Sequence, residues 1–394
     1  MIKAIKVSVD PGYNGTKVVM ENGREFWYDS AVVSDRNQTL REGSMDKRQA
    51  DSSIVVKQGE ETYVVGAGAI GTRMGAETIR SASAIDDSLD LQGTIRYQNP
   101  NFAVLVNASV VSSIIQAAAE GDIVVDGDPD EIRVIASIAL PQDHTKKAAS
   151  VVADLFWNKD FSFDITIGTG ETRHISLVYD HILVFSQVLL SMVGYAADDF
   201  GKFRDDFDYT FYPTLLVDCG YGTIGLCFVL ENGFVSERIE SNTDYAMKSV
   251  NIAVSEKLKQ MGYEISEGDV DVRSRDPHKS IVRKIVMVNG KRKAEQVDVA
   301  EIRKEEVDSI AKKLSDYLYD AYKLETKGSV LVSGGTGEQY YPVLKKEICG
   351  SGVLPENRVI LTQPVYHGKT YDSIYTVAVG GIKYLNGYKF EDNK

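Results

Sequence analysis

Two stretches about two hundred residues apart follow the same pattern, and this repeat constrains the fold more than any other feature of the chain. Residues 7–19 and 215–226 each contain an apolar β-branched run, the motif Asp-x-Gly-Tyr, a short stretch of small and polar residues, and a second apolar run. Apolar runs on both sides of a glycine-containing turn are typical of a β-hairpin. The sequence therefore predicts two β-hairpins with matched turns.

Both predicted turns are suited to binding phosphate. Glycine has no Cβ and can adopt positive φ, so backbone N–H groups there can approach an anion closely. Asp10 and Asp218 each end the first strand of a hairpin. Two carboxylates beside one anion are tolerable when a divalent cation bridges them. Either hairpin alone is also typical of an ordinary turn. The pair favours one nucleotide held between two domains.

A third glycine-rich motif lies near the C-terminal end. The apolar run 330–332 leads into Ser-Gly-Gly-Thr-Gly at residues 333–337, and a helix is expected to follow through Lys345 and Lys346. Glycines at the start of a helix let the backbone lie flat against a planar or anionic ligand. A plain strand-to-helix turn has the same sequence, so this motif gains weight only beside the two hairpins.

Composition limits the classes of partner. The chain has 394 residues, enough for two domains, and a formal net charge of -13, which argues against direct nucleic-acid binding. Basic residues cluster within 273–293, either as a solvated face or as a docking surface for an acidic partner or a neighbouring subunit. The three cysteines lack metal-ligand spacing and fit a reducing cytoplasm.

No membrane segment is predicted. The N-terminus leads directly into a strand without a signal-sequence pattern, and the most apolar stretch, 182–197, is interrupted by serine and glutamine and is interpreted as a core helix. Other expected helices are 102–119, 244–261, 301–324 and 376–385, and Asn289-Gly290 predicts a hairpin turn within 285–296. Expected strands are 5–9, 17–20, 25–28, 54–57, 61–65, 133–140, 161–167 and 174–179.

The order of the two hairpins, the glycine-rich motif and the connecting helices resembles the order found in the actin superfamily. The resemblance covers essentially the whole chain. The resemblance implies an α/β fold with two domains, duplicated ribonuclease H-like mixed sheets and a nucleotide in the interdomain cleft. Domain I would comprise residues 1–197 plus 362–394, and domain II residues 198–361. Residues 376–385, rich in small side chains, would be the second connecting helix.

The resemblance also implies roles for individual residues. Asp10 and Asp218 would hold Mg²⁺, Asp10 through water, and Lys17 would neutralise charge on the phosphates during phosphoryl transfer. An exposed strand lysine is the alternative for Lys17. Tyr221 departs from the pattern, because many relatives carry glycine or aspartate there. The expected nucleotide-binding residues are Gly12, Asn14, Gly15, Thr16, Gly220, Gly222, Thr223, Gly334, Gly335 and Thr336.

The residue type at position 187 indicates whether the site favours hydrolysis of the nucleotide or transfer of its phosphate. The segment 184–191 resembles the connecting helix in which actins carry glutamine. A neutral amide can orient a water in line with the γ-phosphate, whereas a kinase that phosphorylates a hydroxyl uses a carboxylate base. Gln187 therefore favours hydrolysis. A buried helix glutamine satisfied by backbone is the alternative.

Length and composition most resemble the ParM-like actins that segregate bacterial plasmids. This implies a cytoplasmic ATPase that forms head-to-tail filaments and works with a separate DNA-binding adaptor. The motifs leave the choice between ATP and GTP open. The alternatives are a small-molecule kinase and a non-polymerising nucleotide sensor on the same fold.

Overall fold

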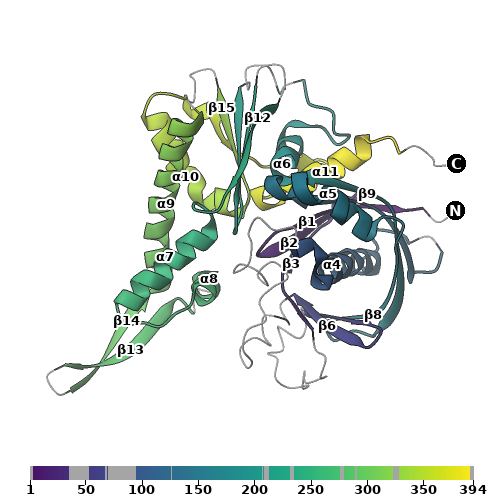
Figure 1. Ribbon diagram of the computed structural model, residues 1–394, viewed down its shortest axis with the longest axis horizontal. Coiled ribbons are helices and arrows are strands. Elements are labelled where there is room, and N and C mark those ends of the chain that lie inside the picture. Colours follow the sequence, from purple (N-terminus) through teal and green to yellow (C-terminus); the bar gives the residue numbers. More distant parts are fainter. Residues whose placement is uncertain are drawn as a thin grey trace. The chain divides into compact units, whose positions relative to one another are not determined.

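The computed structural model describes residues 3–34, 53–66, 69, 95–125, 127–205, 207, 213–230, 235–275, 279–288, 291–322 and 328–390. The chain forms two compact units. The first comprises Met1–Asp208 with Thr362–Lys394, and the second Tyr209–Leu361. The C-terminal segment, drawn in yellow in Figure 1, thus returns to the first unit.

A mixed sheet forms the frame of the first unit. Strands β1 (Ile5–Pro11), β2 (Gly15–Met20) and β3 (Glu25–Asp29) make an antiparallel meander. Strand β7 (Glu131–Leu140) pairs parallel with β1, and β9 (Arg173–Ser186) pairs parallel with β7. The order of these five strands is β3-β2-β1-β7-β9.

Four further strands extend this sheet beyond β9 to nine strands. They follow in the order β8 (Asp160–Ile167), β5 (Ser53–Gln58), β6 (Glu61–Gly66) and β4 (Val32–Ser34). Each new pairing is antiparallel. The sequence predicted the strands at 54–57, 61–65 and 161–167 but not their continuity with the first sheet.

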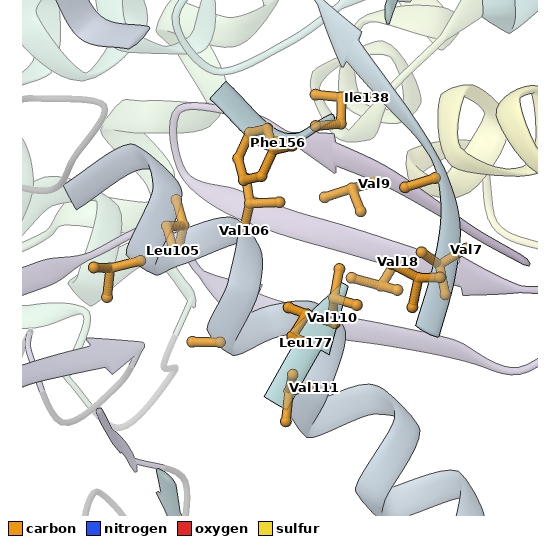
Figure 2. Close-up of a cluster of buried hydrophobic side chains, with 14 of the residues drawn as sticks. Val7, Val9, Val18, Leu105, Val106, Val110, Val111, Ile138, Phe156 and Leu177 are labelled. Carbon is orange, nitrogen blue, oxygen red and sulfur yellow. The ribbon is translucent and has the colours of Figure 1, made fainter. Parts of the chain in front are cut away.

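Helix α4 (Pro100–Ala119) supplies much of the core of the first unit. Asn99 caps its N-terminus by accepting a hydrogen bond from the backbone N–H of Asn101, and proline occupies the first turn. Figure 2 shows Val106 and Val110 of α4 within the buried cluster that contains Val7 and Val18. Among the described helices, α4 alone is long and apolar enough to cross a membrane, but most of it is buried in this core.

Two further helices of this unit are in very close contact. A Cβ on Gly380 of α11 (Thr376–Gly387) would lie 1.9 Å from the Leu190 carbonyl oxygen of α6 (Gln187–Ala196). A Cβ on Gly194 of α6 would lie 2.1 Å from the Thr376 carbonyl oxygen. Only glycine allows two helix backbones to approach so closely, which confirms the predicted close packing of the small-residue helix.

The second unit repeats the strand plan of the first. Strands β10 (Thr214–Cys219), β11 (Ile224–Val229) and β12 (Val235–Asn242) are antiparallel, while β15 (Ser329–Ser333) and β16 (Val359–Leu361) add in parallel. The order β12-β11-β10-β15-β16 has the same pattern as β3-β2-β1-β7-β9. The predicted duplication of mixed sheets is confirmed.

Four helices and a hairpin complete the second unit. Helices α7 (Met247–Gln260), α9 (Val299–Tyr322) and α10 (Gly335–Gly350) supply side chains to its core, and α8 (Glu267–Arg275) packs on α7. The predicted hairpin is present as β13 (Ile281–Val288) and β14 (Lys291–Asp298), paired from Ile281↔Asp298 to Val288↔Lys291. Asn289 and Gly290, the predicted turn, lie outside the described residues.

The structure corrects some element boundaries. The helix expected from residue 184 begins at Gln187, because β9 continues its parallel pairing with β7 as far as Ser186↔Leu140. Helix α5 (Gln142–Phe156), which directly follows Pro141, was not predicted. Short elements complete the chain: α3 (Ile95–Gln98), the strand pair β17 (Val365–Tyr366) and β18 (Lys369–Thr370), and the 3-10 helices Glu356–Arg358 and Ser373–Tyr375.

Candidate functional site

Three predicted catalytic residues meet in the first unit. The Lys17 Nζ atom lies 3.1 Å from Asp10 Oδ2, and the Gln187 Nε2 atom donates a hydrogen bond of 2.7 Å to Asp10 Oδ1. Asp10 and Lys17 are directly opposite each other across the β1–β2 hairpin. Gln187 joins them because it follows β9, which is parallel to β7 and, through it, to β1. The carboxyl ends of parallel strands share one edge of a sheet.

The contact with Asp10 fixes the orientation of the Gln187 amide. An ionised carboxylate only accepts hydrogen bonds, so the amide must present Nε2 to it. Oε1 then points away from Asp10 and can accept a hydrogen bond from a water. Gln187 is thus oriented by a carboxylate, and not by backbone as in the alternative interpretation. Lys17 is also not an exposed strand lysine, since its side chain is 13% exposed.

Packing explains both glycines of the first turn. A Cβ on Gly15 would lie 2.0 Å from a ring carbon of Trp27, and one on Gly12 would lie 2.9 Å from the Gly15 carbonyl oxygen and from Lys17 Nζ. The Trp27 ring also lies 5.3 Å from Lys17 Nζ. The glycines therefore allow the turn backbone to pack directly against Lys17 and Trp27 at the proposed phosphate position.

Polar groups of this turn already form hydrogen bonds within the protein. The Thr16 hydroxyl is buried and lies 2.9 Å from the Ser30 hydroxyl. The Asn14 carbonyl oxygen accepts a hydrogen bond from the Ser30 backbone N–H. The Thr16 hydroxyl is therefore already engaged with Ser30, whereas Asn14 is only half-buried.

Arg96 adjoins the same turn, although no motif in the sequence singled it out. Its Nη2 atom donates a hydrogen bond of 2.7 Å to the Pro11 carbonyl oxygen, and its guanidinium lies 4.7 Å from the Tyr13 ring. The side chain comes from α3, and the residue is 9% exposed. A contact between residues 85 positions apart leaves no local signal in a single sequence.

The second hairpin and the glycine motif meet in the second unit. Ser333 Oγ donates a hydrogen bond of 2.6 Å to Asp218 Oδ1, and Thr336 Oγ1 donates one of 2.9 Å to the Gly220 carbonyl oxygen. Asp218 and Ser333 are brought together by the parallel register of β10 and β15. Gly334, Gly335 and Thr336 were predicted from the sequence to bind the nucleotide, whereas Ser333 was not.

Both the backbone conformation and the packing at residue 334 require glycine. Its φ is +87°, and a Cβ there would lie 2.3 Å from the Cys219 carbonyl oxygen. Gly335 begins α10, and no side chain of the described residues caps the N-terminus of this helix. Its first backbone N–H groups are therefore available to an anion. Gly222 is buried in the second turn, and Thr223 is half-buried.

Tyr221, the residue that departs from the family pattern, forms a backbone hydrogen bond within the second unit. Its carbonyl oxygen accepts a hydrogen bond of 2.8 Å from the Lys248 backbone N–H. Its side chain packs against the hydrophobic core of the second unit. The contact with Lys248 ties the second turn to α7.

The neighbouring cysteines are not suited to nucleophilic chemistry. Burial, followed by the charge of Asp218, raises the pKa of Cys219, and burial raises the pKa of Cys227 to about 12. Both thiols stay protonated near neutral pH, and only the thiolate is a good nucleophile. The reactive groups of the two hairpins are accordingly the carboxylates, the lysine and the amide.

Within the described part of the chain, no cluster of three or more histidine, cysteine or acidic side chains could hold a metal by itself. Asp10 and Asp218 each offer hard carboxylate oxygens at a proposed phosphate turn. Mg²⁺ is commonly held by one or two carboxylates together with waters and substrate phosphates. Each of these carboxylates therefore suits a role in holding Mg²⁺ together with a nucleotide.

Comparison with solved structures reveals the same fold in actin-like and ParM proteins. The actin-like protein Alp7A matches with a TM-score of 0.65 and 14% identity over 98% of this chain and 96% of that chain. A ParM from Clostridium botulinum in a 15-stranded filament matches with a TM-score of 0.59 and 14% identity, over 97% and 99%. ParM from Bacillus thuringiensis with ATP gives 0.57 and 14%, over 96% and 97%.

The chain has the actin-like fold of these bacterial proteins. No protein-family model and no curated protein sequence matches it. Its two related sheets each carry a hairpin, β1–β2 and β10–β11. The expected resemblance in fold is confirmed, and it extends over nearly the whole chain.

Proposed function

We propose that the protein is an actin-like ATPase that binds Mg-ATP through both phosphate hairpins and assembles into dynamic filaments. The observation that carries the proposal is the contact of Gln187 and Lys17 with the two oxygens of Asp10, at the end of parallel strands in an actin-like fold. Lysine, amide and carboxylate are the side chains that a phosphate-hydrolysing site needs for anion binding, water orientation and cation binding.

Each residue has a distinct part in the proposed reaction. Lys17 turns from Asp10 to the phosphates, and Asp10 would hold Mg²⁺, which would neutralise phosphate charge when bound. Gln187 Oε1 accepts a hydrogen bond from the attacking water. The water oxygen bonds to the γ-phosphorus as the bond to the bridging oxygen of ADP breaks, and the released phosphate keeps both protons of the water.

An amide cannot remove a proton from a substrate hydroxyl as a carboxylate does, so hydrolysis is favoured over phosphate transfer. In the second unit, Asp218 and the Ser333–Thr336 segment would contact the same nucleotide from β10 and α10. We infer no preference for adenine over guanine from these contacts, and ATP is proposed because a related structure contains it.

Filament formation is proposed by analogy with the ParM filament of similar fold. Repeated head-to-tail contacts that do not close into a ring produce an open filament. Loss of the γ-phosphate would weaken the assembled state, because a ligand shifts a conformational equilibrium through contacts that differ between the two states. The proposed setting is the bacterial cytoplasm, with plasmid segregation through a separate DNA-binding adaptor.

Phosphate release from Mg-ATP tests the proposed role of Gln187. We expect Gln187→Ala to lower the rate about a hundredfold while nucleotide binding is retained, because a misplaced water costs rate more than affinity. Gln296→Ala, at an exposed position of β14, is the matched control and should release phosphate at the wild-type rate. A Gln187→Ala protein as active as wild type would contradict the assignment.

A further inference from the structure

Arg96 is a buried cation with few partners. A guanidinium has five N–H donors, and burying a charge is costly unless it is paired and hydrogen-bonded. Only one hydrogen bond from Arg96 is formed to the described residues, from Nη2 to the Pro11 carbonyl oxygen. The Nε atom is buried and has no hydrogen-bond partner in that part of the chain.

The surroundings of Arg96 are aromatic. The guanidinium lies 4.7 Å from the Tyr13 ring, 5.8 Å from the Tyr97 ring and 5.7 Å from the Phe102 ring. Aromatic faces attract a cation and hold its plane in place. Arg96 forms no ion pair with a carboxylate of the described residues. Its positive charge is thus positioned without an anion from this part of the protein.

The hydrogen bond to the Pro11 carbonyl oxygen places Arg96 beside the proposed phosphate turn. Pro11 directly follows Asp10, whose carboxylate holds the Gln187 amide. Gln187, Asp10, Pro11 and Arg96 therefore form a continuous series of contacts around the first turn. If Gln187 orients the water that attacks the terminal phosphate, Arg96 borders the region into which that phosphate would project.

We propose that Arg96 binds the γ-phosphate of the nucleotide. This inference rests on the proposed ATPase function and adds a phosphate ligand that lies outside the three motifs. A guanidinium suits this task, because it donates two parallel hydrogen bonds to phosphate oxygens and keeps its charge at every physiological pH. The γ-phosphate would supply the anion that the described residues do not offer to the buried guanidinium.

Two substitutions separate phosphate binding from support of the turn. Arg96→Gln keeps an N–H donor for the Pro11 carbonyl but removes the charge, while Arg96→Lys keeps the charge. Isothermal titration with Mg-AMPPNP and with Mg-ADP gives the affinity with and without the γ-phosphate. Arg133→Gln, which removes a cation paired with Asp180 on the neighbouring strand, is the charge-matched control. Thermal unfolding of each variant confirms that it is folded.

For Arg96→Gln we expect affinity for Mg-AMPPNP to fall about tenfold or more, with affinity for Mg-ADP changed less than about twofold. Arg96→Lys should retain more Mg-AMPPNP affinity than Arg96→Gln. Equal losses for both nucleotides, or equal behaviour of the Gln and Lys variants, would assign Arg96 to support of the turn and overturn the proposal. Absence of binding by the wild-type protein would contradict the ATPase function itself, so the two failures are distinguishable.

Discussion

The two proposed metal-binding aspartates are held by different kinds of donor. Asp10 accepts hydrogen bonds from a lysine and an amide, whereas Asp218 accepts one from the hydroxyl of Ser333. The charged partner in the first unit can be exchanged for phosphate and Mg²⁺. The neutral Ser333 hydroxyl can stay hydrogen-bonded to Asp218 when a cation binds, because it carries no charge that the cation would repel. Asp10 is thus expected to change partners on nucleotide binding, and Asp218 to keep its partner.

Ser333→Ala should therefore weaken nucleotide binding. Removal of the hydroxyl takes a donor from the buried Asp218 carboxylate, and the penalty for a buried polar group that loses a partner is about 1–3 kcal/mol. We expect a loss of Mg-ATP affinity of about fivefold or more by titration, with thermal stability also lowered.

The matched control is Ser329→Ala at the start of the same strand. Ser329 Oγ is buried and has no hydrogen-bond partner in the described part of the chain, so its removal should leave nucleotide affinity unchanged. Similar losses of affinity in both variants would show that Ser333 acts only through the stability of β15.

At the scale of elements, the contact between α6 and α11 positions Gln187, the first residue of α6. Gly380→Ala places a methyl group 1.9 Å from the Leu190 carbonyl oxygen, where backbone cannot yield cheaply. We expect a loss of about 2–4 kcal/mol in the free energy of unfolding, measured by urea denaturation. In the control Gly268→Ala, on α8, the new Cβ meets no atom within 4 Å, and stability should not fall.

Lys383 gives the same helix pair a pH dependence. Its ammonium is buried in α11 and donates hydrogen bonds to the Gly194 and Ala197 carbonyl oxygens at the end of α6. Burial lowers the pKa of Lys383 to about 8, against an ordinary value of 10.5, while Asp199 and Asp198 raise it and Arg204 lowers it. Between these two values the unfolded chain binds more protons than the folded one, so the free energy of unfolding should rise with pH.

Comparison with Lys383→Met isolates this effect, because the other titrating groups are shared. From pH 7 to pH 10, wild type should gain on the order of 2 kcal/mol in the free energy of unfolding relative to the variant. Urea denaturation at several pH values measures the difference between the two proteins. A difference that stays constant over this range would contradict the lowered pKa.

Local patterns predicted the elements that carry the site. The turn glycines and alternating apolar runs marked both hairpins, and parallel pairing then brought Gln187 to Asp10. Helix α5 was missed although Ala148, Val152 and Phe156 are spaced four residues apart on its buried side. The start of α6 was placed early because residues 184–186 are apolar enough for either a helix or a strand, and only pairing with β7 decides.

At the scale of the molecule, the internal repeat predicted two matched hairpins and the family resemblance implied duplicated mixed sheets, and the structure confirms both. The repeat did not predict that β8, β5, β6 and β4 join the first sheet, because strand pairing between distant segments leaves no local pattern. The position of Arg96 beside the first turn could not be predicted from the sequence for the same reason. Residues whose roles depend on neighbours in space, such as Arg96 and Ser333, emerge only from the fold.

The central claim is that ATP drives assembly and its hydrolysis reverses it. The direct test is right-angle light scattering of the purified protein after addition of Mg-ATP, with phosphate release followed in the same cuvette. We expect scattering to rise after a lag above a critical concentration and to decay as phosphate appears, and Gln187→Ala to rise without the decay. Phosphate release with flat scattering at every protein concentration would contradict filament assembly. The absence of both scattering and phosphate release would contradict filament assembly and ATP hydrolysis together.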